Sequence, residues 1–184
     1  MQEAEGKLFE ISQQNMKKDY TQINPVIHEA YEMLQNAAKR SDGLSGLSSG
    51  FEKLDKMTSG WQNSDLIIIA ARPAMGKTAF VLSMAKKMAV DMKIPCAMFS
   101  LEMSNVQLVN RMIVNVCEIP GEKIKSGQLA PYEWGQLDSK ITQLYDAPFY
   151  VDDTPSLSVF ELRTKARRLV REHGVKIIMI DYLQ

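Results

Sequence analysis

The sequence predicts an α/β protein in which a parallel β-sheet is flanked by helices. From Phe51 onward, short apolar runs suited to buried strands alternate with segments of helical composition, and this alternation is typical of parallel sheets. The chain has 184 residues, of which 45% are hydrophobic, enough to bury a substantial core. We therefore expect one principal domain with an appendage at its N-terminus.

Charge and hydropathy exclude several classes of protein. The 22 basic and 22 acidic side chains cancel, so no global field draws the chain to nucleic acid or anionic lipid. The longest strongly apolar run, Leu66–Ala71, is far shorter than the ~20 residues that span a bilayer, and the N-terminus lacks the apolar core of a signal peptide. We expect a cytoplasmic protein that does not contact a membrane. Cys96 and Cys117 lack the spacing of a zinc site, and we expect them to be buried, inert thiols.

An amphipathic helix is expected over residues 24–40. Asn24 and Pro25 supply an N-cap and a first-turn proline, and apolar residues follow at helical spacing. A helix of this length is marginal in water, so its apolar stripe needs a surface to dock on. The residues alone leave two surfaces open, the helix's own domain and a neighbouring subunit. The stripe consists of Ile27, Tyr31, Leu34 and Ala38.

The segments on either side of this helix are expected to pack little. Residues 1–23 are polar and charged, which suits the end of a preceding structure. Residues 41–50, "SDGLSGLSSG", are rich in serine and glycine, so we expect a flexible linker. Residues 51–184 then form the α/β domain.

Each strand and helix of this domain has a local signal. The expected strands are apolar runs, as strands buried on both faces require. Ser104 and Ser158 begin capping boxes, and Gly174 closes the last helix. Because the last strand would need a following crossover to be covered, we expect the chain to be a fragment cut inside a domain. The expected strands are Leu66–Ala71, Pro95–Leu101, Pro148–Val151 and Val175–Ile180, and the expected helices are Thr78–Met92, residues 104–117, Pro131–Leu144 and residues 158–174.

The decapeptide "ARPAMGKTAF", residues 71–80, has the composition of a phosphate-binding loop. Such a loop needs inward backbone N–H groups, a helix N-terminus aimed at the anion, a lysine for the β and γ oxygens, and a hydroxyl for magnesium. Gly76 stands where a Cβ would crowd the phosphate, Lys77 supplies the charge, and Thr78 supplies the hydroxyl. Ala71 replaces the usual first glycine, which is tolerable where the strand ends. The loop itself is Arg72, Pro73, Ala74, Met75 and Gly76.

Hydrolysis of a bound nucleotide also needs a carboxylate that helps to hold magnesium and a group that activates water. Ligands of open α/β sheets bind beyond the carboxyl ends of the strands, where Asp181 and Glu102 both fall. We expect Asp181 to serve the metal and Glu102 to be the general base. The pair Asp152–Asp153 also follows a strand, but we favour a role in a turn or at the start of a helix.

A basic helix and two histidines complete the candidates. Glu161 and Glu172 flank the basic residues, which favours a solvated or subunit-facing surface over a nucleic-acid groove. His28 and His173 lack metal partners in the sequence, and we expect them on the surface. The basic residues are Arg163, Lys165, Arg167, Arg168 and Arg171.

Three stretches together resemble the RecA-like ATPase domain of the bacterial DnaB-type replicative DNA helicases. They are "GLSSGFEKLDKMTSGWQNSDLIIIAARPAMGKTAF", "FSLEM" and "IIMIDYLQ", in that order. The family tolerates alanine at the position of Ala71 and carries an Arg-Pro-x-Met-Gly-Lys-Thr loop. The resemblance runs from Gly43 to Gln184 and, more loosely, through the helix from Asn24 to Arg40.

The resemblance implies more than the residue pattern does. Members of the family are hexameric rings that encircle one DNA strand and move along it with ATP bound between adjacent subunits. The resemblance makes Lys77 and Thr78 the contacts of phosphate and Mg²⁺, Glu102 the catalytic base, and Asp181 the carboxylate linked to Mg²⁺. It implies ATP and Mg²⁺ as ligands, a homo-hexamer, and packing of the helix at 24–40 on the next subunit. Single-stranded DNA, a primase and a helicase loader are the implied partners.

The chain also departs from the family pattern. Residues 1–23 resemble only the tail of the family's N-terminal domain and the connection leaving it. The sequence stops before the DNA-contacting loops and the arginine that reaches a neighbour's nucleotide, a group that can supply about 10³ to 10⁵ in rate. We therefore expect the fragment alone to bind ATP but to hydrolyse it negligibly. Two alternatives stay open: another RecA-like ATPase, such as a recombinase relative or a circadian-clock-type kinase, and a nucleotide-gated assembly module without chemistry.

Overall fold

The computed structural model describes residues 22–38 and 43–182. The chain divides into two compact units, Met1–Ser45 and Gly46–Gln184, which are described separately. In the first unit, helix α2 (Ile23–Ala38) confirms the predicted amphipathic helix over its described length. The apolar side chains of Ile27, Tyr31 and Leu34 on this helix are exposed. The predictions for residues 1–21, 39–40 and 41–42 lie outside the described residues.

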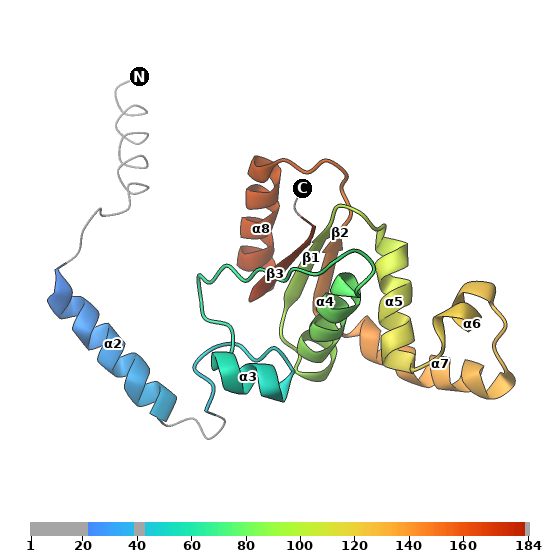
Figure 1. Ribbon diagram of the computed structural model, residues 1–184, viewed down its shortest axis with the longest axis horizontal. Coiled ribbons are helices and arrows are strands. Elements are labelled where there is room, and N and C mark those ends of the chain that lie inside the picture. The colour runs from blue at the N-terminus through green and yellow to red at the C-terminus, as the bar shows by residue number, and fades with distance from the viewer. Residues whose placement is uncertain (1–21, 39–42, 183–184) are drawn as a thin grey trace. The chain divides into compact units, whose positions relative to one another are not determined.

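A parallel three-stranded sheet forms the centre of the second unit (Figure 1), which confirms the predicted α/β fold. Its strands are β1 (Cys96–Ser100), β2 (Phe149–Asp152) and β3 (Ile177–Asp181). The order is β2-β1-β3, and all five residues of β1 are buried. The central strand, which is apolar except for Ser100, is thus covered on both faces, as the sequence pattern predicted.

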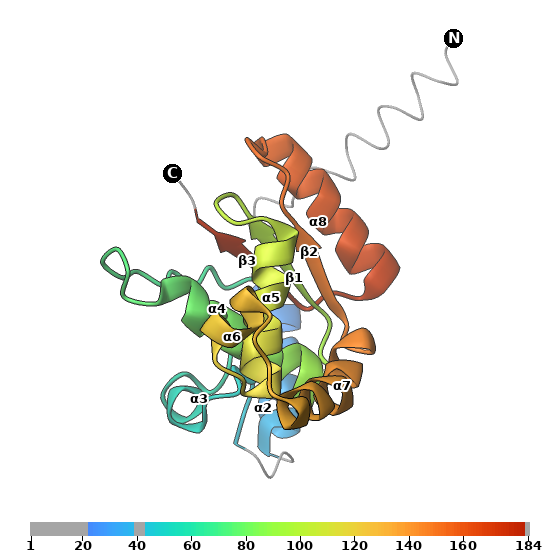
Figure 2. The ribbon, with the colours of Figure 1, turned by 90° about the vertical axis from the view of Figure 1, so that its right-hand side faces the viewer.

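Helices cover the two faces of this sheet. Figures 1 and 2 show α4 (Lys77–Ala85) and α5 (Asn105–Cys117) on one side and α8 (Val159–His173) on the other. A π-helical segment, η1 (Lys86–Asp91), continues α4. The core between α4, η1, α5 and the sheet is rich in methionine, whose flexible side chain fills irregular gaps. It includes Leu82, Met84, Met88, Met98, Leu108, Met112 and Met179.

Local signals in the sequence placed most helix ends correctly. Ser104 begins α5 and Ser158 begins α8, each with the predicted capping box, and Gly174 ends α8 in the left-handed conformation. Helix α7 (Pro131–Tyr145) is also as predicted. Two short helices, α3 (Glu52–Thr58) and α6 (Gly121–Ser126), were not predicted, because six or seven residues give too few turns for a periodic pattern to stand out.

The predicted strand Leu66–Ala71 is absent from the structure. The segment pairs with no other strand in the described part of the chain, and Leu66 and Ile68 are 84% and 81% exposed. An apolar run becomes a buried strand only where another strand supplies hydrogen bonds along its edge and layers cover its faces. The sequence shows the run but not whether those partners are present.

The predicted flexible linker is wrong for Gly46–Gly50. Leu47 pairs with Trp61 in an antiparallel bridge, and Ser49 is fully buried. A Cβ on Gly50 would lie 2.3 Å from Cβ of Lys87, so glycine here permits close packing on η1. The serine and glycine residues of this segment therefore form a packed turn, although their composition suggested a flexible linker.

Both cysteines are buried and free, as predicted. Burial raises the pKa of the Cys96 thiol to about 12 and also raises the pKa of Cys117, which keeps both in the unreactive thiol form. Among the described residues, no helix combines the length and the apolar character that crossing a bilayer demands.

Candidate functional site

The loop from Arg72 to Gly76 connects the unpaired apolar run to α4. A backbone hydrogen bond from Met75 N–H to the Arg72 carbonyl closes its turn at 3.2 Å, and the loop is exposed. Gly76 has φ +84°, a conformation that favours glycine. A Cβ at Gly76 would meet no protein atom within 4 Å, so the constraint visible in the structure is the backbone angle. Crowding of a phosphate by that Cβ stays a prediction.

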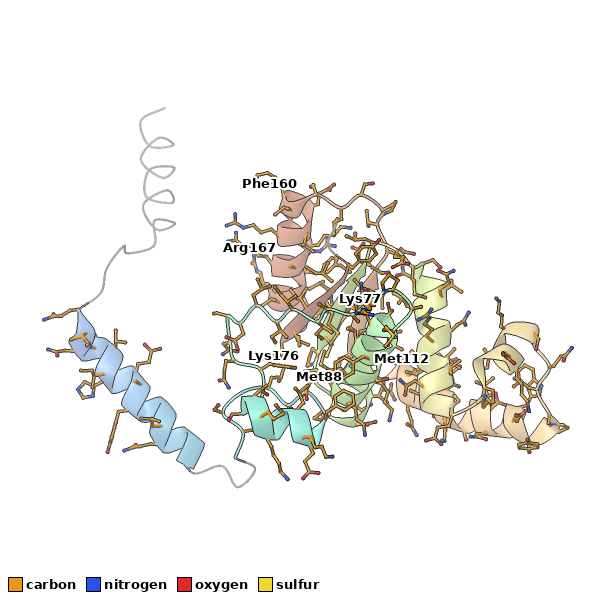
Figure 3. All side chains as sticks on the ribbon, viewed as in Figure 1. Lys77, Met88, Met112, Phe160, Arg167 and Lys176 are labelled. Atoms are coloured by element: carbon orange, nitrogen blue, oxygen red, sulfur yellow. The ribbon has the colours of Figure 1, made fainter. Side chains whose placement is uncertain are left out.

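Helix α4 begins directly after this loop, at Lys77. The first N–H groups of a helix have no partner within the helix, and the aligned peptide dipoles make its N-terminus attractive to anions. The core side chains Leu82, Met84 and Ala85 anchor the helix to the sheet. Its N-terminus therefore presents backbone donors at a fixed place, with Lys77 beside them (Figure 3).

Asp181 at the end of β3 meets both residues that follow the loop. The Thr78 hydroxyl donates a hydrogen bond of 2.6 Å to Oδ2 of Asp181, and Nζ of Lys77 lies 3.6 Å from Oδ1. Only 3% of the Asp181 surface is exposed. A buried carboxylate of this kind needs cationic or hydrogen-bonding partners, and the first turn of α4 supplies them from about a hundred residues earlier in the chain.

The parallel pairing of β1 with β3 brings Glu102 to the same edge of the sheet. Ser100 pairs with Asp181 in the register, and the Leu101 N–H donates to the Asp181 carbonyl at 2.8 Å. Glu102 follows directly, on the loop between β1 and α5, and it is exposed. The structure therefore gathers the three segments that carry Lys77, Thr78, Glu102 and Asp181, as the rule for strand ends predicted.

Tyr182 is a site residue that the sequence reasoning did not identify. Nζ of Lys77 lies 4.2 Å from the centroid of the Tyr182 ring, a distance at which the ring face attracts a cation. Its place directly after Asp181 was the available signal, but spacing alone does not say that a tyrosine will face a lysine from another segment.

The chemistry of these donors fits a magnesium-bound triphosphate. Among the residues that the structure describes, no three His, Cys, Asp or Glu side chains form a metal cluster. Mg²⁺ needs no such cage, because it is commonly held by one or two carboxylates together with substrate phosphates and waters. The Thr78 hydroxyl and the Asp181 carboxylate, already in contact, are oxygen ligands of the required kind.

Comparison with known proteins identifies the family. The family model of the DnaB-like helicase C-terminal domain matches residues 46–184, which is most of the chain and the whole of the second unit. The chain belongs to the DnaB-like helicase family.

Curated members of the family align with the whole chain. The replicative DNA helicase DnaB of Geobacillus stearothermophilus is 42% identical over 184 residues, and the replicative DNA helicase DnaC of Bacillus subtilis is 39% identical over 184 residues. In both cases the chain spans about 40% of the length of the relative.

Solved structures agree with the family assignment. One solved ATPase domain has a TM-score of 0.81 and 34% identity, over 90% of this chain and 58% of that one. A DnaB-like replicative helicase, solved in a study of its interactions with primase, has a TM-score of 0.76 and 34% identity, over 99% of this chain and 43% of that one. The RecA-like ATPase fold expected from the resemblance is therefore confirmed.

The remaining residues that the sequence singled out in this DnaB-like chain lie away from Lys77, Thr78 and Asp181. Asp153 accepts hydrogen bonds at the start of α5, a helix-start role of the kind predicted, and Asp152 pairs with Lys165 at 2.7 Å.

On α8, Phe160 and Arg167 point away from the sheet (Figure 3) and are exposed. The basic helix is thus solvated on this side, as predicted, while a role in facing another subunit remains a prediction. His28 and His173 are on the surface, as predicted.

Proposed function

We propose that this chain is the nucleotide-binding part of an ATP-driven replicative DNA helicase. The observation that carries the proposal is the 2.6 Å contact between the Thr78 hydroxyl and the Asp181 carboxylate. It joins a phosphate-type loop to the carboxyl end of a parallel strand, where nucleotides bind in α/β proteins. Membership of the DnaB-like family supports the same assignment.

The loop and the N-terminus of α4 bind the triphosphate of ATP. Backbone N–H groups between Ala71 and Thr78 surround the phosphates, and the conformation of Gly76 turns the chain toward them. Lys77 neutralises the β and γ oxygens as charge builds up during transfer. Asp181 and Tyr182 both lie next to Nζ of Lys77, and we propose that they hold this ammonium group where it can reach the phosphates.

Thr78 and Asp181 would supply the protein's oxygen ligands to Mg²⁺. When bound, this ion neutralises the phosphate oxygens and orients the γ-phosphate for in-line attack. The sheet keeps Asp181 in place through its pairing with Ser100, and the core of α4 keeps Thr78 in place. The protein thus presents both oxygen ligands without rearranging its backbone.

Glu102 acts as the general base. It stands at the end of β1, one strand away from Asp181, and is exposed where a water could approach a γ-phosphate. A carboxylate in hydrogen-bond reach of that water orients it and accepts its proton as the bond to phosphorus forms. The bond between the γ-phosphorus and the bridging oxygen breaks, ADP leaves, and the proton of the water passes to Glu102 and not to an oxygen of the γ-phosphate.

The energy of hydrolysis drives movement along DNA in the complete protein. We propose a homo-hexamer that encircles single-stranded DNA in the cytoplasm and works with a primase and a helicase loader. One structural neighbour, a DnaB-like replicative helicase, interacts with primase, which supports the choice of that partner. The exposed side chains of Ile27, Tyr31 and Leu34 on α2 support its packing on an adjacent subunit, because apolar side chains at helical spacing on a short helix need a partner surface.

The test is the substitution Glu102→Gln in the complete protein. An amide keeps the shape of the side chain but cannot accept the proton, so we expect turnover of ATP to fall by about 10² or more. Binding of a fluorescent ATP analogue should stay within about twofold, since Glu102 lies outside the phosphate loop. The matched control is Glu122→Gln, an exposed carboxylate on α6, which should leave both quantities unchanged. Unchanged turnover in Glu102→Gln would contradict the role of Glu102 as general base, whereas no turnover in the unsubstituted complete protein would favour an assembly module without chemistry.

A further inference from the structure

We propose that Asp153 is a positioning residue that holds the Glu102 loop in its active geometry. This inference rests on the proposed function, in which Glu102 is the general base. Asp153 follows β2, an edge strand of the described sheet, and its side chain binds the start of α5. Its effect on the reaction would pass through the segment that it binds.

The carboxylate of Asp153 holds the first residue of α5 with both of its oxygens. Oδ2 accepts the backbone N–H of Asn105 at 2.8 Å, and Oδ1 accepts the side-chain Nδ2 of the same residue at 2.9 Å. Hydrogen bonds to a charged acceptor are about twice as strong as neutral ones. A two-point contact also fixes the orientation of the residue that it binds, and not only its distance.

The loop that carries Glu102, residues 101–104, is short and is fastened on both sides. On the β3 side, the Leu101 N–H donates to the Asp181 carbonyl at 2.8 Å. At its centre, the Met103 N–H donates to Oγ of Ser100 at 3.0 Å. On the β2 side, the two hydrogen bonds from Asn105 to Asp153 hold the end of the loop. Because β1 lies between β2 and β3, the two acidic strand ends hold this loop from opposite sides.

This arrangement matters because Glu102 is itself exposed. Packing does not fix the side chain of an exposed carboxylate, so its backbone must be fixed instead. A misplacement of about 1 Å in a reacting group can lower a rate by on the order of 10²-fold. Releasing Asn105 would let the start of α5, and with it Glu102, move relative to Asp181.

Asp152, the adjacent residue, provides a matched control. It is also a carboxylate at the end of β2, but it pairs with Nζ of Lys165 at 2.7 Å and accepts the Thr154 N–H at 2.9 Å. These contacts lie on α8 and the segment leading to it, not on the Glu102 loop. Loss of Asp152 therefore removes a similar charge while leaving the loop fastened.

The first experiment compares Asp153→Ala with Asp152→Ala in the complete protein. We expect Asp153→Ala to lower kcat for ATP by roughly 10- to 100-fold, with Kd for a fluorescent ATP analogue changed by less than about threefold. Asp152→Ala should leave kcat within about threefold. Equal losses of kcat in the two variants, or a loss confined to nucleotide binding, would overturn the inference.

If Asp153→Ala unfolds the protein, exchanging the side chains of Asn105 and Asp153 tests the same contact. Asn105→Asp places two carboxylates face to face, so kcat should fall. Adding Asp153→Asn to that variant restores an acceptor for the backbone N–H and an amide donor for the introduced carboxylate, so kcat should recover to within about threefold. Failure of the double variant to recover, with its melting temperature restored, would sink the proposal.

The Glu102→Gln background separates this inference from the proposed function. If Asp153 acts through Glu102, adding Asp153→Ala to Glu102→Gln should lower the residual single-turnover rate by less than about threefold, because nothing remains to be positioned. If Asp153→Ala lowers the rate of Glu102→Gln by as much as it lowers the rate of the unsubstituted protein, Asp153 does not act through Glu102. An unchanged rate in Glu102→Gln alone would instead refute the role of Glu102, whereas a slow Glu102→Gln beside a fully active Asp153→Ala would refute only the positioning role.

Discussion

Asp55 is a carboxylate that the fold buries, with only 6% of its surface exposed. It accepts the Ser49 N–H at 2.8 Å and the hydroxyls of Ser48 and Ser49 at 2.6 Å each. Burial acts to raise the pKa of Asp55, but the hydrogen bonds from Ser48 and Ser49 outweigh it and hold the pKa below its ordinary value. The charged form of one residue thus organises the turn that begins the ATPase domain.

Replacement of Asp55 should destabilise the domain in a pH-dependent way. We expect Asp55→Asn to lower the free energy of unfolding by about 2 kcal/mol at pH 7. Because the folded pKa is depressed, the stabilisation is present above the unfolded pKa of about 3.9 and is lost as the pH falls through the folded value. Urea unfolding at several pH values should therefore show the two proteins converging below about pH 4.

A control for this effect lies on the same helix. Glu52 pairs with Lys56 at 2.6 Å, but both side chains are mostly exposed. Glu52→Gln should change the free energy of unfolding by less than about 0.5 kcal/mol. A pH-independent deficit in Asp55→Asn would mean that shape, and not charge, is what the turn requires.

Gly76 and Gly127 separate the conformational role of a glycine from its role in binding. They have φ of +84° and +69°, and an added Cβ meets no protein atom within 4 Å at either position. Each change to alanine should therefore cost roughly 1 kcal/mol of backbone strain. Only Gly76→Ala should also weaken ATP binding, by about tenfold or more, because only Gly76 lies in the proposed phosphate-binding loop. Calorimetric titration of both variants with ATP and Mg²⁺ checks this, and equal affinities would remove Gly76 from the site.

At the scale of elements, the same kind of apolar run has two outcomes in this chain. Cys96–Ser100 is a strand with parallel neighbours on both sides. Leu66–Ala71 is unpaired within the described residues, although it is equally apolar. Hydrogen-bond partners along the strand edge, and not hydrophobicity, account for the difference.

Amide hydrogen exchange should distinguish these two runs in the 184-residue chain. Amides of residues 66–71 lack ladder hydrogen bonds and should exchange within seconds to minutes, near the low end of local stability. Amides of β1 should exchange only through opening of the whole domain. Mass spectrometry of peptides covering each run would measure this, and equal protection of both runs would show that residues 66–71 are paired in solution.

At the scale of the whole molecule, ligand binding and stability are coupled. The proposed phosphate contacts lie on the loop and α4, the proposed metal ligands on α4 and β3, and the proposed base after the end of β1. A nucleotide bound there would connect segments that are otherwise joined mainly by the core. A ligand that binds only the folded state stabilises it by about 2.7 kcal/mol at a concentration of 100 Kd. Binding should therefore be visible as a rise in the temperature of unfolding.

Two lysines test this coupling at opposite ends of the sheet. We expect ATP with Mg²⁺ to raise the melting temperature of the chain by several degrees, and Lys77→Ala to remove most of that rise. Lys176→Ala should keep it, because Lys176 lies next to the start of β3 with an exposed side chain (Figure 3). A rise that survives Lys77→Ala would place the nucleotide elsewhere.

Capping residues and periodicity were sufficient to predict much of the fold. Ser104, Ser158 and Gly174 mark helix ends by chemistry that acts within one turn, so they could be found without a structure. Strand alternation with helices predicted parallel pairing, and parallel pairing predicted that Asp181 and Glu102 would share one edge of the sheet. At that edge, Asp181 contacts Lys77 and Thr78.

Long-range partners decided the rest. Sequence composition made Gly46–Gly50 look flexible, yet Asp55, Trp61 and Lys87 turn it into a packed segment. The sequence likewise could not show that Tyr182 faces Lys77 or that Asp153 holds Asn105 beside β1. Local preferences are carried by neighbouring residues and can be read along the chain, whereas these contacts join segments far apart in sequence and exist only once the sheet has set the order β2-β1-β3.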